Sequence, residues 1–132
     1  MSMRVEYKSK NETENLIQKI GKMQLKFVLD SYGKRTTRML AEATPKDTGK
    51  TAESWSYEVE ESDNSASLTI NNSNKSVEGK GHGHIPIVQL IRYGHTTRNG
   101  GYVAPNDFVS PIAKQMFDEA DNKVWSMYRK GN

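Results

Sequence analysis

Apolar residues recur every three or four positions from Leu16 to Ala43, which predicts one long helix. Asn11 and Glu14 have the spacing of a capping box at its start. Thr44-Pro45 ends the helix, because a residue before proline avoids helical geometry. The stretch is about 30 residues long, which is unusual for a small domain.

The apolar positions of this helix fall on two nearly opposite faces. One face carries Leu16, Ile20, Met23 and Phe27, and the other carries Leu25, Leu29, Tyr32, Met39 and Ala43. A helix that is apolar on two sides must be covered on two sides. We therefore expect a sheet of the same chain on one side and a second helix or another molecule on the other. The alternative is a kink at Gly33 that keeps a single surface throughout.

The remaining elements are shorter, except for the last. Apolar and polar residues alternate from Trp55 to Glu60 and again from Leu68 to Ile70, so residues 54–71 read as an antiparallel hairpin. Residues 85–93 suit a short helix or strand, and residues 102–104 suit a third strand. A final helix begins with Ser110 as N-cap and Pro111 in its first turn. Its apolar stripe consists of Ala113, Met116, Phe117, Ala120, Val124, Met127 and Tyr128.

This order of elements predicts an α+β fold, in which a long N-terminal helix and a C-terminal helix pack on a small antiparallel β-sheet. We expect one domain over residues 1–132, with residues 1–11 as a flexible arm and residues 71–84 as a mobile loop. Only 24 of the 132 residues are Leu, Ile, Val or Phe. The core is therefore thin for the length of the chain, and this favours a partner that completes it.

The net charge of +3 conceals an uneven distribution. Residues 1–50 hold eleven basic and six acidic side chains, whereas residues 51–71 hold five acidic side chains and no basic one. Opposite charges of this kind steer association with copies of the chain or with a partner. The expected interface therefore combines apolar and charged positions: Leu25, Leu29, Tyr32, Met39, Glu58, Glu60, Glu61, Lys75 and Lys80.

The residue types offer little for catalysis or metal binding. There is no cysteine, and two of the three histidines, His82 and His84, stand in a glycine-rich run without apolar neighbours to fix them. The segment around Lys80 lacks the Gly-Lys-Ser/Thr ending of a phosphate loop. No apolar run reaches the length of a membrane span, and the polar N-terminus lacks a secretion signal. We expect no enzyme activity, no cofactor and no membrane contact, and synthesis in a cytoplasm.

Three motifs in series are distinctive. They are Thr44-Pro45-Lys46-Asp47-Thr48-Gly49-Lys50 with Ser54-Trp55 after it, residues 90–103 with Tyr93-Gly94-His95 and Gly100-Gly101, and Phe108-Val109-Ser110-Pro111. Physically they are turns, in which Pro45 ends a helix, Asp47 caps the backbone, and Gly49, Gly94 and the Gly100-Gly101 pair supply positive φ. Together they resemble the small neck, or tail-completion, proteins of long-tailed bacteriophages and prophages. Lys50-Thr51-Ala52 and Ile112 depart from the pattern of that family.

The resemblance implies a virion protein without catalytic residues, whose motif positions maintain shape: Pro45, Asp47, Thr48, Gly49, Tyr93, Gly94, His95, Gly100, Gly101 and Pro111. It implies a ring, expected to be a hexamer, that caps the tail tube and docks on the head connector. Its partners are then other copies of itself and connector or tail-tube proteins, with sequence-independent contact to passing DNA. The alternative, suggested by a pI of about 9.1, is a small basic nucleic-acid-binding regulator.

Overall fold

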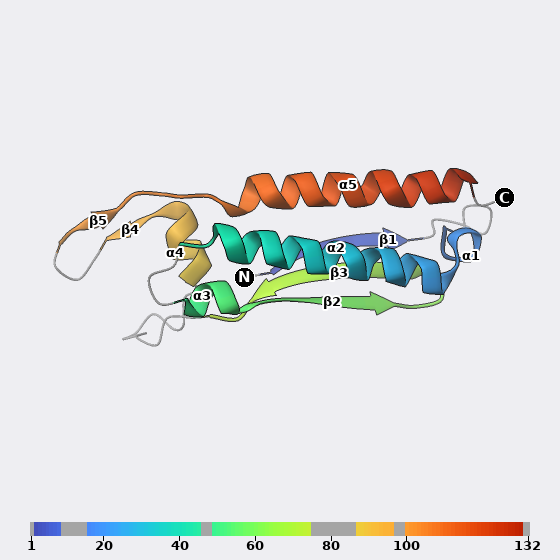
Figure 1. The fold of residues 1–132 in the computed structure, drawn as a ribbon, viewed down its shortest axis with the longest axis horizontal. Helices are drawn as coiled ribbons and strands as arrows, with labels where there is room; N and C mark the ends of the chain where they lie inside the picture. The colour runs from blue at the N-terminus through green and yellow to red at the C-terminus, as the bar shows by residue number, and fades with distance from the viewer. Residues whose placement is uncertain (1, 9–15, 46–48, 75–86, 97–99, 131–132) are drawn as a thin grey trace.

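The computed structural model describes residues 2–8, 16–45, 49–74, 87–96 and 100–130. The elements are β1 (Ser2–Lys8), α1 (Leu16–Ile20), α2 (Lys22–Ala43), α3 (Lys50–Glu53), β2 (Trp55–Glu61), β3 (Ser65–Asn72), α4 (Ile87–Tyr93), β4 (His95–Thr96), β5 (Tyr102–Val103) and α5 (Val109–Lys130). The two long helices, α2 and α5, run in opposite directions and pack on a three-stranded antiparallel sheet (Figure 1). The predicted α+β class is confirmed.

The sheet has the order β1-β3-β2, with both outer strands antiparallel to β3. The predicted hairpin is β2 and β3. The expectation of a flexible arm over residues 1–11 is wrong for residues 2–8, because β1 pairs with β3 along its whole length. Tyr7 is buried in the hydrophobic core and Met3 and Val5 pack against it, whereas the polar residues between them face outward. The expected loop 71–84 starts later than predicted, because β3 continues to Asn72. The part of it from residue 75 to 84, with Lys75, Lys80, His82 and His84, lies outside the described residues.

The predicted long helix is interrupted at Gly21. Its φ of 99° and ψ of 130° are accessible to glycine and strained for other residues. The break changes the direction of the apolar stripe, so that α1 buries Leu16 and Ile20 while α2 buries Leu25 and Leu29. One core therefore receives residues that an unbroken helix would place on opposite sides.

Gly33 is not the site of a kink. The helix α2 is continuous through it, and Gly33 is buried where α2 crosses β2. A Cβ atom at this position would lie only 2.4 Å from Cδ2 of Tyr57. The missing side chain therefore lets the helix approach the strand closely. The Tyr57 hydroxyl donates a hydrogen bond of 2.6 Å to Asp30, one turn earlier in α2, which fixes the ring across the glycine.

The turn after α2 has the predicted character where it is described. The helix ends at Ala43, and Thr44 is extended, as expected before Pro45. The buried Thr44 hydroxyl donates to the Leu40 carbonyl at 2.6 Å and accepts from Nε1 of Trp55 at 2.9 Å. Gly49 is left-handed at φ 78°, which agrees with its predicted role. Asp47 and Thr48 lie outside the described residues.

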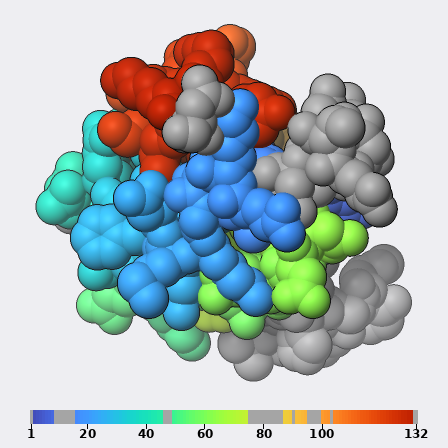
Figure 2. All heavy atoms as spheres, turned by 90° about the vertical axis from the view of Figure 1, so that its right-hand side faces the viewer, coloured from blue at the N-terminus to red at the C-terminus, as the bar shows by residue number. Residues whose placement is uncertain are grey.

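The end of the molecule that carries α1 is closed by aromatic contacts. Figure 2 views this end, with α1 and the start of α2 between α5 and the β2–β3 hairpin. The Nζ atom of Lys19 lies 4.3 Å from the ring centroid of Tyr128, and the rings of Tyr128 and Trp125 meet edge to face at 5.4 Å. The contact of Lys19 with Tyr128 joins α1 to the last turns of α5.

Candidate assembly surfaces

A ridge of two large apolar side chains stands on the outer side of α2. Met23 is 83% exposed and Phe27 is 77% exposed, and they lie four residues apart on one helix face. We call them the Met23–Phe27 ridge. They point away from the face of Leu25 and Leu29, which are fully buried. Neighbouring large apolar groups on a surface are typical of protein interaction sites.

The ridge lies on a basic surface. The exposed side of α2 carries five cations, Lys22, Lys26, Lys34, Arg35 and Arg38, with Asp30 and Glu42 as the acidic side chains of the helix. Lys34 lies 3.6 Å from Asp30, and Lys22 lies 3.7 Å from Asp63 at the tip of the hairpin. Exposed ion pairs of this kind contribute little to stability, and the helix keeps most of its positive charge. The ridge therefore suits a partner that is both apolar and acidic.

The strand β2 carries the opposite charge. Glu58 and Glu60 are exposed on the sheet face that the helices do not cover, and Glu61 is exposed at the end of the strand. Neither β2 nor β3 contains a lysine or arginine. The acidic residues that the sequence concentrates in 51–71 thus give the hairpin an acidic outward face. Across the central strand from Glu58, in the same row of the sheet, is Arg4 of β1.

A third surface is the arm formed by β4 and β5, which extends beyond the helices and the main sheet (Figure 1). His95 pairs with Val103 and Thr96 with Tyr102. Tyr93 at its base is 63% exposed, and Tyr102 is 67% exposed. A two-stranded ladder this short is marginal in water, so the arm depends on the body for its position. Gly94 and Gly100 have positive φ, as predicted for these turns, whereas Gly101 does not.

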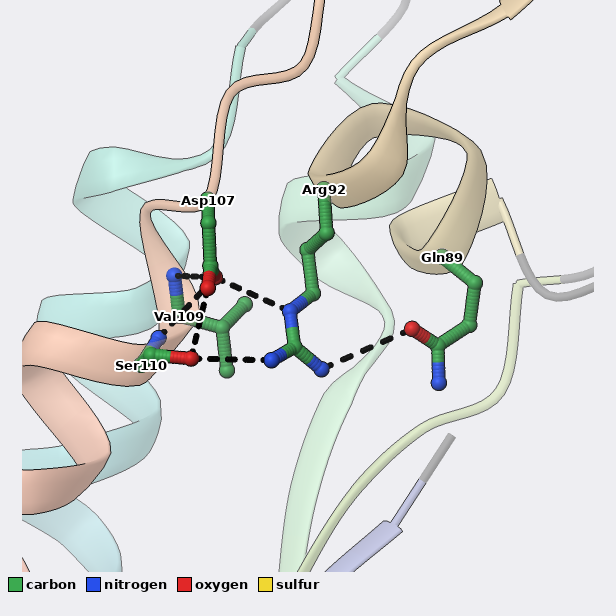
Figure 3. A network of polar contacts seen from close by, with 5 residues as sticks. All are labelled: Gln89, Arg92, Asp107, Val109 and Ser110. Carbon is green, nitrogen blue, oxygen red and sulfur yellow. Dashed lines mark hydrogen bonds and ion pairs between the residues drawn. The ribbon is translucent and has the colours of Figure 1, made fainter.

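The base of the arm is fixed by a polar network between α4 and the start of α5 (Figure 3). The guanidinium of Arg92 donates to Asp107 Oδ1 and to Ser110 Oγ at 2.9 Å each, and to Gln89 Oε1 at 3.5 Å. Asp107 also accepts bonds from the backbone N–H groups of Val109 and Ser110, at 3.2 and 3.1 Å. Asp107 is therefore the cap of α5, and the predicted N-cap Ser110 lies inside the first turn.

The charge state of Asp107 follows from these contacts. Burial raises the pKa of its carboxyl group, but hydrogen bonds from Ser110 and Arg92 outweigh burial and lower the pKa to about 2. The anion also lies at the positive end of the α5 dipole. The Asn106 N–H adds a bond of 2.8 Å to the Ile91 carbonyl. Both ends of the arm are thus anchored by ionised or backbone groups at neutral pH.

The predicted interface stays a prediction, and the structure shows only which of its residues are exposed; its apolar members are largely buried. Leu25 and Leu29 belong to the core, and Tyr32 and Met39 are half-buried beside it. The reason is the break at Gly21: the apolar face of α1 cannot be extended into α2 by counting residues, because the two helices are not continuous. Met23 and Phe27, assigned to the opposite face, are the exposed pair. Glu58, Glu60 and Glu61 are exposed as expected.

The strongest side-chain hydrogen bonds outside the arm have structural roles. Tyr7 donates to Asp121 and joins β1 to α5, and burial together with this bond raises the pKa of the tyrosine well above its usual range. The bond from Tyr57 lowers the pKa of Asp30. Within the described residues, no three His, Asp or Glu side chains gather as metal ligands. The candidate features are therefore surfaces: the Met23–Phe27 ridge, the acidic face of β2 and the β4–β5 arm.

No known protein family, curated protein or solved structure matches the chain. In the parts of the chain that the structure describes, no helix has the combination of length and apolar character needed to span a membrane.

Proposed function

We propose that this protein is a structural component of a long-tailed bacteriophage virion. It forms a ring, expected to be hexameric, at the head–tail junction, where it completes the tail and joins it to the head connector. The observation that carries the proposal is the Met23–Phe27 ridge on a basic helix. The family is suggested by the resemblance of the turn motifs around Pro45–Gly49, Tyr93–His95 and Pro111 to neck and tail-completion proteins.

The ridge favours assembly for energetic reasons. Burying a Met or Phe side chain fully is worth about 1.5–3 kcal/mol relative to leaving it in water. A monomer with a thin core gains nothing from holding both residues outside, whereas a subunit gains from each contact with its neighbour. The cations around the ridge orient an approaching partner and raise the association rate more than they raise the affinity.

The test is assembly of the purified full chain, alone and with tail-tube or head-connector proteins, followed by sedimentation and electron microscopy. We expect rings, or binding at the end of the tail tube. Met23→Ser and Phe27→Ser should abolish assembly while the circular dichroism spectrum and melting temperature remain those of the parent. The matched control is Gln115→Ser on the exposed side of α5. A monomer that joins no neck or tail protein would rule the proposal out.

A second candidate, a nucleic-acid-binding regulator, is favoured by the five exposed cations of α2. A salt titration of DNA affinity separates the two. The logarithm of the affinity falls with the logarithm of salt concentration with a slope of about −0.9 per phosphate contact. Tight binding to one sequence favours the regulator. Weak binding that is equal for all sequences is expected of a ring through which DNA passes.

A further inference from the structure

In the part of the chain that the structure describes, the two outer strands of the sheet are edges of equal length. Among the described strands, β1 and β2 each pair with β3 alone, and each has seven residues. Both are antiparallel to β3, so they are parallel to each other. An edge strand presents unpaired N–H and C=O groups, which can pair with a strand of another chain.

The apolar face of the sheet is incompletely covered at both edges. Leu68 and Ile70 of β3 are fully buried. Their row partners, Val59 and Tyr57 on β2 and Val5 and Met3 on β1, are only partly buried. The core therefore thins out at each edge, and each edge offers two half-exposed apolar side chains in the same two rows.

The outward faces of the two edges carry opposite charge. The β2 edge has Glu58 and Glu60 and no cation, whereas on β1 Arg4 and Lys8 flank Glu6 and form ion pairs with it. Pairing two β2 edges would bring four carboxylates together, and pairing two β1 edges would join two net positive strands. Like charges directly opposite each other on a sheet are destabilising. The charges thus oppose a symmetric pair and favour β2 against β1.

We propose that β2 of one copy pairs with β1 of a second copy and continues the sheet across the subunit boundary. The inference rests on the proposed ring and adds a sheet contact between its subunits to the contact that the Met23–Phe27 ridge makes. A repeat about an axis along the strands preserves strand direction, so the pairing is parallel. Tyr57 then lies beside Met3 of the next copy, Glu58 beside Arg4, and Val59 beside Val5. The two surfaces differ, so the contact is heterologous and repeats until a ring closes.

Introduced cysteines test the contact directly, since the chain has none of its own. Arg4 and Glu58 both pair with Thr69, so within one chain they are two strand spacings apart, about 10 Å. A disulfide requires Cα atoms within about 7 Å. Under mild oxidation, Arg4→Cys/Glu58→Cys should therefore form a covalent ladder that ends at the ring size. Arg4→Cys/Thr69→Cys should close within the monomer, and Glu58→Cys/Lys114→Cys should form no such ladder.

Charge reversal supplies an independent readout by sedimentation. Glu58→Lys alone and Arg4→Glu alone should each weaken association about threefold to tenfold. Assembly should return in the double variant Arg4→Glu/Glu58→Lys, and also when the two single variants are mixed, because alternating copies restore both opposite-charge contacts. Both positions are exposed, so the melting temperature of the monomer should change little; Arg4→Glu loses only the exposed ion pair with Glu6.

The outcomes separate this inference from the proposed function. Rings without the ladder, or without rescue on mixing, overturn the edge contact while the ring remains. A ladder with rescue, in a protein that binds no connector or tail-tube protein, supports the edge contact and overturns the role in the phage neck. A protein that gives no covalent species beyond a dimer at high concentration overturns the edge contact.

Discussion

Replacing Gly33 with alanine tests how closely α2 packs on β2. The new Cβ atom would lie 2.4 Å from Cδ2 and 2.7 Å from Cγ of Tyr57, whereas ordinary contacts begin near 3.4 Å. The ring cannot swing away freely, because its hydroxyl is bonded to Asp30 of the same helix. Overpacking of this kind costs about 1–3 kcal/mol, and alanine recovers about 1 kcal/mol of helix propensity over glycine.

We therefore expect Gly33→Ala to lower the free energy of unfolding by up to about 2 kcal/mol, which corresponds to a fall in melting temperature of up to about 10 °C. The assay is thermal and urea unfolding followed by circular dichroism. In a Tyr57→Ala background the ring is absent, and the same substitution should stabilise the protein by about 1 kcal/mol. An equal effect of Gly33→Ala in the parent and in the Tyr57→Ala background would refute the close-packing argument.

Four further substitutions probe other parts of the structure. Leu25→Ala should cost about 2–5 kcal/mol in urea unfolding, whereas Phe27→Ala should change stability by less than about 0.5 kcal/mol; similar losses would contradict the assigned faces of α2. Asp107→Ala should cost about 0.5–2 kcal/mol, because it removes the cap of α5 and the partner of Arg92. The pKa of Asp107 falls from 3.8 to about 2 on folding, so its contribution to the free energy of unfolding is present above about pH 4 and is lost as the pH falls toward 2. The free energy of unfolding of the variant should therefore change less with pH over this range. Tyr7→Phe removes the hydrogen bond to Asp121 and should cost about 1–2 kcal/mol, read by urea unfolding at neutral pH; no change would mean that the bond does not hold β1 to α5.

Local patterns predicted the elements whose signals lie within a few residues. The alternation around Trp55 and Leu68 predicts a hairpin over 54–71, and the strands occupy 55–61 and 65–72. The Ser110-Pro111 signal and the stripe from Ala113 to Tyr128 predict the last helix, which begins at Val109, two residues before the predicted first helical position. In both cases the buried face follows directly from the period of the sequence.

Two features depended on distant contacts. Met3, Val5 and Tyr7 alternate with polar residues, which is a strand signal, but a single short strand gains stability only from the partner it finds more than 50 residues away. The other is Gly21. A glycine inside a helical pattern can be tolerated or can break it, and here the surrounding core decides. Extending one helical phase across Gly21 assigned Leu25 and Leu29 to the outside.

The candidate surfaces were predictable to the extent that they depend on charge. Glu58 and Glu60 had to face water, because an unpaired carboxylate in a core is costly. The exposure of Met23 and Phe27 could not be derived, because it depends on which face of α2 the sheet covers. The network around Arg92 and Asp107 joins residues 15 positions apart, and no local period signals such a pair.

The pairing of β1 with β3 also means that β1 is synthesised well before the strand with which it pairs. The residues of β1 leave the ribosome roughly sixty residues before those of β3 with which they pair. At about 5–20 residues per second, β1 waits about 3–12 s for its partner. During that interval α1 and α2 are made without the sheet that covers Leu25 and Leu29. The nascent chain thus exposes both a free strand and an uncovered helix face, and the rate of translation through β3 sets how long it is open to aggregation.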